Sequence, residues 1–215
     1  MSSSSSSSGA KIITIEGNIG SGKSTMINRL RTTYDNVVVI DEPVDQWLSM
    51  KDENDKSLLE LFYSDMNRWS YTFQNSAFIT RYLNAFQAIQ QHKDQPNTVF
   101  ISERGILTDR YVFASMLKDN GNLSSIEWQL YTKWFDHFQT LINIQGIVYI
   151  DTPSEVCSER IKKRNREGES NIPLSYLQSL EKYHLDWINN TNLPVLKVSS
   201  DASELQKIVD FALNV

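Results

Sequence analysis

Gly17-Asn18-Ile19-Gly20-Ser21-Gly22-Lys23-Ser24 is the stretch of sequence that decides the fold. It fits G-x-x-x-x-G-K-[ST], the pattern of a loop whose backbone N–H groups cradle phosphates. A β-rich apolar run precedes it at residues 11–16, and residues 23–33 have a helical pattern. A strand, a glycine loop and a helix in this order predict a nucleoside triphosphate site formed by residues 17–25, Thr25 included.

Two side chains of this loop have separate predicted roles. Lys23 can reach the outer phosphates, and the helix that it begins presents its partial positive charge to them. The Ser24 hydroxyl can ligate Mg²⁺. The motif alone predicts binding of the triphosphate and leaves the fate of the phosphate open.

Composition favours a folded α/β chain. The protein has 215 residues, 40% of them hydrophobic, and a net charge of −5. These values exclude a disordered chain and give no general attraction to nucleic acid or to a membrane surface, so neither partner is expected. No apolar run approaches the length of a membrane span.

The N-terminus and the cysteine count bear on domains and location. Residues 1–10 are a serine-rich tract that we expect to be disordered, followed by a single domain over residues 11–215. Cys157 is the only cysteine, which rules out an intrachain disulfide and fits a reducing compartment. The first arginine, Arg29, lies within the helix after the loop, so no arginine-rich transit peptide is expected. A cytoplasmic location is the simplest expectation.

Five short apolar runs predict a parallel sheet. They are residues 11–16, 37–41, 99–103, 147–151 and 195–198, and helical patterns separate them. Such alternation is typical of an α/β fold with helices on both faces of a parallel sheet. Because ligands bind at the carboxyl ends of such strands, the polar residues there should approach the glycine loop. These residues are Glu16, Asp41, Glu42, Glu103, Arg104 and Asp151.

Two long segments between the strands have helical character. Residues 57–92 are rich in aromatic side chains and predict two helices. Residues 123–142 are amphipathic, with large apolar side chains at helical spacing. This second stripe predicts either a core helix or a subunit interface, and we expect a homodimer.

Candidate catalytic carboxylates follow the second and third strands. Pro43 ends the second strand, so Glu42 is held at the sheet edge, where it is either a general base for an attacking hydroxyl or a solvated turn residue. Glu103 can hold Mg²⁺ directly or through water. Arg104 beside it can bridge an acceptor hydroxyl and the transferred phosphoryl group, or form a local ion pair.

A basic cluster at residues 159–170 predicts a lid over the phosphates. Arg160 and Arg164 are four residues apart and share one helical face, and Arg166 follows them. Arginines supplied to a phosphoryl transition state raise the rate by about 10³–10⁵. The alternatives are a solvated basic face and a nucleic-acid patch.

The order of the motifs resembles that of the deoxynucleoside kinases, and more narrowly their deoxycytidine, deoxyguanosine and deoxyadenosine kinase branch. The resemblance runs from about Lys11 to the C-terminus. It is carried by the phosphate loop, Glu42-Pro43 with Trp47, residues 68–74 (RWSYTFQ), Glu103-Arg104-Gly105 with Asp109-Arg110-Tyr111, Thr152-Pro153, the arginine cluster and residues 172–177 (IPLSYL). It implies a P-loop kinase fold with an arginine-rich lid, ATP with Mg²⁺ as donor, a deoxynucleoside as acceptor, and a homodimer.

The resemblance also implies roles for individual residues. Glu42 would activate the 5′-hydroxyl of the deoxyribose, and Arg104 would position that hydroxyl. The phosphates would be met by Lys23, Arg160, Arg164 and Arg166, and the 3′-hydroxyl by Tyr63 and Glu169. The base would lie among Trp47, Leu59, Phe62, Phe73 and Phe113, with the amide of Gln74 on its edge.

Arg81 and Asp109 bear on the choice of base. Arg81 lies seven residues after Gln74 on the same predicted helix face, as does Ala77. In the family, an arginine and an aspartate here accompany selectivity for deoxycytidine and purine deoxynucleosides. A buried pair would crowd the 5-methyl group of thymine, while Asp109 can accept from an exocyclic amine. We therefore expect deoxyadenosine first, with deoxyguanosine or deoxycytidine as alternatives.

Three other functions share part of this sequence pattern. A nucleoside monophosphate kinase of the thymidylate kinase type shares the loop and the lid, but it needs further basic groups at the acceptor phosphate. A non-catalytic binding module would have lost Lys23, Glu42 or Glu103, and all three are present. A nucleic-acid-dependent NTPase fits poorly with the negative net charge.

Overall fold

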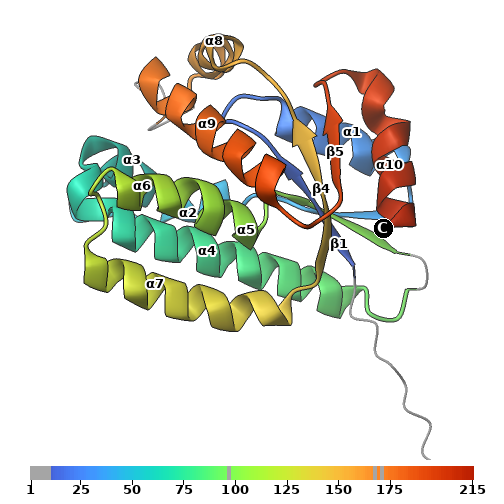
Figure 1. The fold of residues 1–215 in the computed structure, drawn as a ribbon, viewed down its shortest axis with the longest axis horizontal. Helices are drawn as coiled ribbons and strands as arrows, with labels where there is room; N and C mark the ends of the chain where they lie inside the picture. Colours follow the sequence, from blue (N-terminus) through green and yellow to red (C-terminus); the bar gives the residue numbers. More distant parts are fainter. Residues whose placement is uncertain (1–10, 96–97, 167–168, 170–171) are drawn as a thin grey trace, which may run out of the picture.

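Five parallel strands form the centre of the molecule, a computed structural model that describes residues 11–95, 98–166, 169 and 172–215 (Figure 1). They lie in the order β2-β3-β1-β4-β5, and every pairing is parallel. Their bounds are β1 Ile12–Glu16, β2 Val37–Ile40, β3 Val99–Glu103, β4 Ile144–Ile150 and β5 Val195–Val198. The α/β fold class predicted from the sequence is confirmed. The serine tract predicted to be disordered lies outside the described residues.

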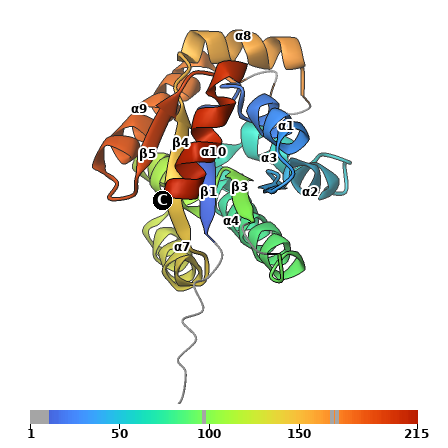
Figure 2. The same ribbon diagram turned by 90° about the vertical axis from the view of Figure 1, so that its right-hand side faces the viewer.

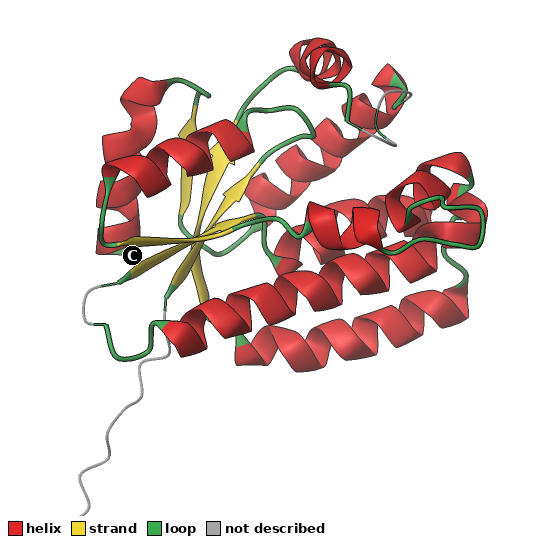
Figure 3. Ribbon diagram, turned by 180° about the vertical axis from the view of Figure 1, so that it is seen from behind, coloured by secondary structure: helices red, strands yellow, loops and turns green. Residues whose placement is uncertain are grey.

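The strands are apolar because helices cover both faces of the sheet. On one face, α1 (Lys23–Thr33) and α10 (Leu205–Asn214) pack against the sheet through residues such as Leu30 and Ile208. Figure 2 shows these two helices beside the strands. Figure 3 shows the yellow strands enclosed between the two groups of helices.

The opposite group of helices builds most of the site. It comprises α2 (Val44–Ser49), α3 (Leu58–Ser64), α4 (Met66–Gln91), α7 (Ser125–Phe138) with its 3₁₀ extension η2 (Gln139–Leu141), α8 (Ser154–Arg164) and α9 (Leu174–Asn190). Residues 57–92 form two helices as predicted. They divide at Asp65, whose carboxylate accepts from the backbone N–H of Arg68 and caps α4.

Three short helical segments follow β3 in succession. It runs through α5 (Ile106–Thr108), the π-helix η1 (Asp109–Ala114) and α6 (Ser115–Asp119), and the 3₁₀ helix η3 (Ala202–Glu204) precedes α10. Within the described ranges, no helix is both long and apolar enough to span a bilayer.

Candidate active site

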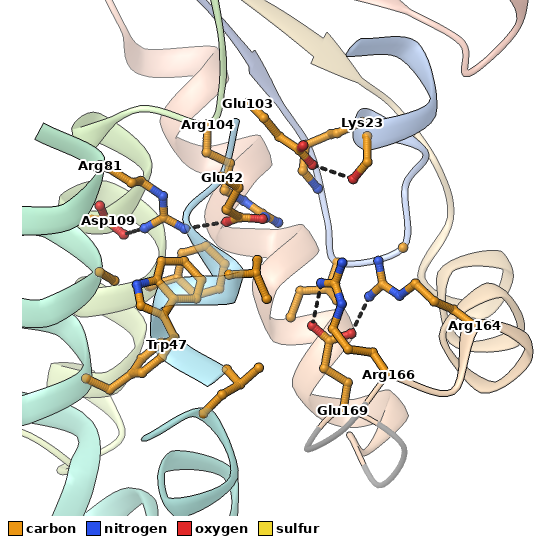
Figure 4. A pocket seen from close by; sticks show the side chains of 18 of the residues that line it. Lys23, Glu42, Trp47, Arg81, Glu103, Arg104, Asp109, Arg164, Arg166 and Glu169 are labelled. Carbon is orange, nitrogen blue, oxygen red and sulfur yellow. Dashed lines mark hydrogen bonds and ion pairs between the residues drawn. The ribbon is translucent and has the colours of Figure 1, made fainter. Parts of the chain in front are cut away.

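A cavity of about 330 Å³ opens at the carboxyl ends of the strands (Figure 4). It runs from the glycine loop to the inner faces of α2, α3, α4 and η1. Its lining includes most of the residues predicted from the sequence: Ile19, Gly20, Gly22, Lys23, Ser24, Thr25, Glu42, Trp47, Leu59, Tyr63, Phe73, Gln74, Ala77, Arg81, Glu103, Arg104, Asp109, Phe113, Arg160, Arg164, Arg166 and Glu169.

The glycine loop has the backbone of a phosphate cradle. Gly20 and Gly22 have φ of +79° and +103°, a region that favours glycine. A Cβ at Gly20 would lie 2.7 Å from the carbonyl oxygen of Cys157. Lys23 begins α1, and its Nζ donates to the carbonyls of Gly17 at 3.1 Å and Asn18 at 2.7 Å. Burial, with a contribution from Arg104, lowers the pKa of Lys23 to about 7.

Ser24 and Glu103 lie together at this end of the cavity. The Ser24 hydroxyl donates to Glu103 Oε1 at 2.7 Å. Burial and the nearby charge of Glu42 raise the pKa of Glu103, so a cation here would relieve repulsion. Among the described residues, no three His, Cys, Asp or Glu side chains are arranged to hold a metal ion. This pair therefore fits Mg²⁺ that takes its other ligands from water and substrate phosphates.

Glu42 lies between two arginines at the centre of the cavity. Its carboxylate accepts from Arg104 Nη1 at 3.0 Å and 3.1 Å and from Arg81 Nη2 (Figure 4). Burial alone would raise the pKa of Glu42, but Arg104 and Arg81 outweigh it and lower the pKa well below the usual range. Glu42 is therefore ionised at neutral pH and held in one position. The alternative reading of a solvated turn carboxylate is wrong.

Arg81 and Asp109 form the buried ion pair at the far end. Arg81 reaches from α4 and donates to Asp109 Oδ1 as well as to Glu42 (Figure 4). Burial raises the pKa of Asp109 to about 6, and Arg81 opposes that shift. Asp109 Oδ2 and Gln74 Oε1 are buried and have no hydrogen-bond partner among the described residues. Two acceptors of lining residues thus have no donor within the part of the chain that the structure describes.

The π-helix η1 contributes two residues to the end of the cavity at which Arg81 and Asp109 lie. Asp109 and Phe113, four residues apart, both line the cavity, and the Arg104 guanidinium lies 5.2 Å from the Phe113 ring. π-helical turns occur often at functional sites. The sequence prediction placed Asp109 near the site and gave no sign of the π-helix.

Aromatic side chains form a wall of the cavity. Trp47 and Phe73 meet edge to face with ring centroids 5.3 Å apart, and Phe62 stacks on Phe73 at 4.5 Å. The Trp47 indole donates to Thr80 Oγ1 at 3.0 Å, which fixes its plane. Wide, flat apolar surfaces of this kind suit a planar ring.

Lid arginines reach the cavity from α8 and from the segment after it. Arg160 donates to the carbonyl of Ser21 at 3.0 Å and to Ser200 Oγ at 3.2 Å. Arg164 and Arg166 both pair with Glu169, the latter at 3.2 Å (Figure 4). The helix α8 ends at Arg164, and Asn165 directly after it has a φ of +47°.

The lining differs from the sequence prediction at five positions. Phe62 does not line the cavity; it supports Phe73 from behind. Gly17, Asn18 and Ser21 also lie behind the surface, where their backbone carbonyls bind Lys23 and Arg160. Val44 was missed and does line the cavity. Its position directly after Pro43, at the start of α2, was the available signal.

Comparison with known proteins decides the family. The model of the deoxynucleoside kinase family matches residues 13–212. The chain is 37% identical to a probable deoxycytidine kinase of fowlpox virus over 199 residues, covering 89% of this chain and 79% of that protein. The chain belongs to the deoxynucleoside kinase family.

Further relatives of this kinase come from vertebrates. Human deoxycytidine kinase is 35% identical over 209 residues, with 88% of this chain and 80% of the human protein covered. A mitochondrial deoxyguanosine kinase of Xenopus laevis is 32% identical over 211 residues, covering 86% and 80% respectively. These matches favour a nucleoside kinase over the monophosphate kinase alternative.

Proposed function

We propose that the protein transfers the γ-phosphate of Mg-ATP to the 5′-hydroxyl of a deoxynucleoside whose base carries an exocyclic amine, with deoxyadenosine preferred. The observation that carries the proposal is the single cavity that joins a phosphate cradle to an aromatic pocket, with Glu42 between them. A nucleoside placed along it would present its 5′-hydroxyl to Glu42 and its base to Gln74 and Asp109.

At the donor end, the chain binds phosphates and neutralises their charge. The backbone of residues 17–25 cradles the β- and γ-phosphates, and Lys23 turns from its own loop carbonyls toward them. Ser24 and Glu103 would hold Mg²⁺, which supplies charge neutralisation when bound. Arg160, Arg164 and Arg166 add positive charge on the opposite side.

At the centre, Glu42 orients the acceptor. Phosphoryl transfer needs little covalent chemistry from the protein, and positioning with electrostatic stabilisation carries most of the catalysis. The ionised Glu42 would accept a hydrogen bond from the 5′-hydroxyl and take its proton as the hydroxyl oxygen bonds to the γ-phosphorus. The bond from that phosphorus to the β,γ-bridging oxygen breaks at the same time, and ADP leaves. Arg104, which donates to Glu42 at 3.0 Å, keeps the carboxylate aimed and stabilises charge on the transferred group.

The sugar would lie beside Tyr63 and Glu169. Both side chains line the cavity, from α3 and from the segment after α8. Tyr63 keeps its proton, because burial, Tyr176 and Glu169 raise its pKa well above 10. It therefore remains a hydrogen-bond donor for the 3′-hydroxyl.

The two unpartnered acceptors favour an amine-bearing base. Gln74 Oε1 and Asp109 Oδ2 both require donors. An exocyclic amine carries two N–H groups, whereas thymine offers one N–H on its Watson–Crick edge and adds a methyl group. Ala77, small and buried between Gln74 and Arg81 on α4, leaves room for the larger purine ring.

A homodimer and a cytoplasmic location belong to the same proposal. Three large side chains of α7 lie exposed in one stripe, Ile126 (63%), Leu130 (43%) and Trp134 (53%). Such a patch is typical of a protein interface. The buried, unpaired thiol of Cys157 suits a reducing compartment. Light scattering should give the mass of a dimer for the wild type and that of a monomer for Ile126→Glu. A monomeric wild type, or a variant whose mass is unchanged, would contradict a dimer formed through α7.

The reaction is tested by product analysis with Mg-ATP. Deoxyadenosine, deoxyguanosine, deoxycytidine, thymidine and their 5′-monophosphates are offered separately, and products are identified by mass and by retention against 5′- and 3′-monophosphate standards. We expect 5′-monophosphates from the amine-bearing nucleosides and almost none from Glu42→Gln. Phosphorylation of the monophosphates alone would overturn the proposed acceptor.

A further inference from the structure

We propose that Glu16 is a positioning residue for Arg104, a role that no motif assigns to it. Glu16 is the last residue of β1, is fully buried, and is absent from the cavity lining. The inference rests on the proposed function, because it explains how Arg104 is aimed at Glu42. Its observable is therefore the rate of phosphoryl transfer.

Arg104 has an unusual backbone. Its φ is +59°, in the left-handed region that residues with a Cβ seldom adopt. Such conformations persist where surrounding contacts over-determine them, and they cluster at active sites. The side chain that this backbone presents donates to both oxygens of Glu42, at 3.0 Å and 3.1 Å.

Successive residues of β1 and the loop after it hold this backbone. The carbonyl of Ile15 accepts from Arg104 N at 3.0 Å, Glu16 Oε1 accepts from Gly105 N at 3.1 Å, and the carbonyl of Gly17 accepts from Arg104 Nη2 at 2.9 Å. The Ile15 and Gly17 contacts come from main chain, which any sequence supplies. Two side chains bind the peptide unit on the C-terminal side of Arg104: Glu16 accepts from its N–H, and the Ser102 hydroxyl donates to its carbonyl at 2.6 Å.

Stability alone does not explain a carboxyl group in this place. Burial raises the pKa of Glu16, although the Thr108 and Thr14 hydroxyls and the charge of Arg104 oppose that shift. Burying such a group costs free energy that an apolar side chain would not. Together with the Ser102 hydroxyl, the contact of Glu16 with Gly105 N fixes the Arg104–Gly105 peptide, whose geometry sets where the guanidinium lies.

Two conservative variants distinguish the position of the Glu16 side-chain oxygen from its negative charge. Glu16→Gln keeps an oxygen at the same distance from Gly105 N and removes the charge. Glu16→Asp keeps the charge and withdraws the oxygen by one C–C bond, about 1.5 Å. Because a misplacement of about 1 Å can cost about 10²-fold in rate, we expect kcat of Glu16→Asp to fall by about 10- to 100-fold. For Glu16→Gln we expect kcat within about 3-fold of wild type, and for both a KM for the nucleoside within about 3-fold.

A stability control and a second background complete the test. Ile208→Ala, in the core between α10 and the sheet, destabilises the fold without touching Arg104 and should leave kcat of the folded fraction unchanged. In Arg104→Ala, the change Glu16→Asp should cost less than about 2-fold further in kcat, since residues that act as a unit are not additive.

The outcomes are distinct. A lower kcat for Glu16→Gln than for Glu16→Asp, equal losses in both, or an undiminished loss in Arg104→Ala would overturn the positioning role. If Glu16→Asp does not fold, Glu16→Gln still tests the inference, because kcat far below wild type contradicts it. Inactivity of the wild type toward every nucleoside would instead overturn the proposed function.

Discussion

The two ends of the cavity are built in different ways. The phosphate end consists largely of backbone, with a glycine loop, the start of α1 and carbonyls that bind Lys23 and Arg160. The base end consists of side chains from α2, α3, α4 and η1 that meet only in the folded protein. Under the proposed function, the first end holds the phosphoryl donor and the second end selects the acceptor.

Their charges also differ in how they are compensated. Lys23 and Arg160 donate to neutral carbonyls at the phosphate end. At the base end, Arg81 joins the two carboxylates of Glu42 and Asp109 in one buried network. Substitutions at the phosphate end should therefore act through the donor, and those at the base end through both stability and acceptor choice.

The largest effect should come from Glu42, where the two ends meet. Glu42→Gln removes the ionised acceptor for the 5′-hydroxyl, so kcat should fall by about 10³-fold for every nucleoside. Asp41→Asn is the matched control, because Asp41 is exposed and pairs with Arg31 on the surface. Steady-state kinetics measure both. If kcat of Glu42→Gln lies within 10-fold of the wild-type value, Glu42 is not the base.

Loss of Arg81 should be the next largest effect. Arg81→Met leaves Glu42 and Asp109 without their shared partner, which should lower the free energy of unfolding by about 3–5 kcal/mol. Arg31→Met breaks the exposed pair with Asp41 and should cost at most about 1 kcal/mol. Urea unfolding compares the two. Equal losses of unfolding free energy would mean that the buried network stabilises the fold no more than the exposed pair does.

Gly20→Ala should affect the phosphate end alone. The new Cβ would lie 2.7 Å from the Cys157 carbonyl oxygen at a φ of +79°, so the cradle must shift. We expect KM for ATP to rise by about 10-fold and KM for the nucleoside to stay within about 2-fold. Gly121→Ala has the same φ of +79° with no atom within 4 Å and controls for backbone strain. If KM for ATP and KM for the nucleoside rise together, the two ends of the cavity do not act separately.

The smallest effect should be a pH dependence at the base end. Asp109, with a pKa of about 6, is ionised above that pH and protonated below it. Protonation removes the charge that holds Arg81, so kcat/KM for the nucleoside should fall as the pH drops through 6. Asp109→Asn should flatten this acidic limb. If the acidic limb of the pH profile persists in Asp109→Asn, it reports the titration of another group.

The sign of the stability effect separates this limb from acid unfolding. A carboxyl whose pKa is raised in the folded state binds a proton more readily there than in the unfolded chain. Between pH 4 and 6 this group therefore adds stability as the pH falls. Thermal unfolding of wild type and Asp109→Asn at pH 5 and pH 7 checks that activity is lost while this contribution to stability grows.

The sequence predicted one end of the cavity better than the other for a physical reason. The glycine loop works through local backbone geometry, so its pattern is contiguous and readable. Glu42, Arg81 and Asp109 lie far apart in the chain, and only the resemblance to a family connected them. Their shared network and the contact of Glu16 with Gly105 depend on tertiary structure.

The differences between the predicted and observed lining have the same origin. The family resemblance placed Phe62 at the base, whereas in the structure Phe62 stacks on Phe73 and does not line the cavity. The π-helix at Asp109 has no simple sequence pattern, so the placement of Phe113 came from the family resemblance. The strand bounds were closer, because buried parallel strands are short and nearly continuous in apolar residues.

One measurement tests the claim that the base end decides the acceptor. It is the ratio of kcat/KM for deoxyadenosine to that for thymidine, in wild type and in Arg81→Met/Asp109→Ala. We predict a wild-type ratio of at least about 10, equal to about 1.4 kcal/mol, and a ratio below about 2 in the double variant. A wild type that uses thymidine equally well, or a ratio that the double variant leaves unchanged, would contradict the account.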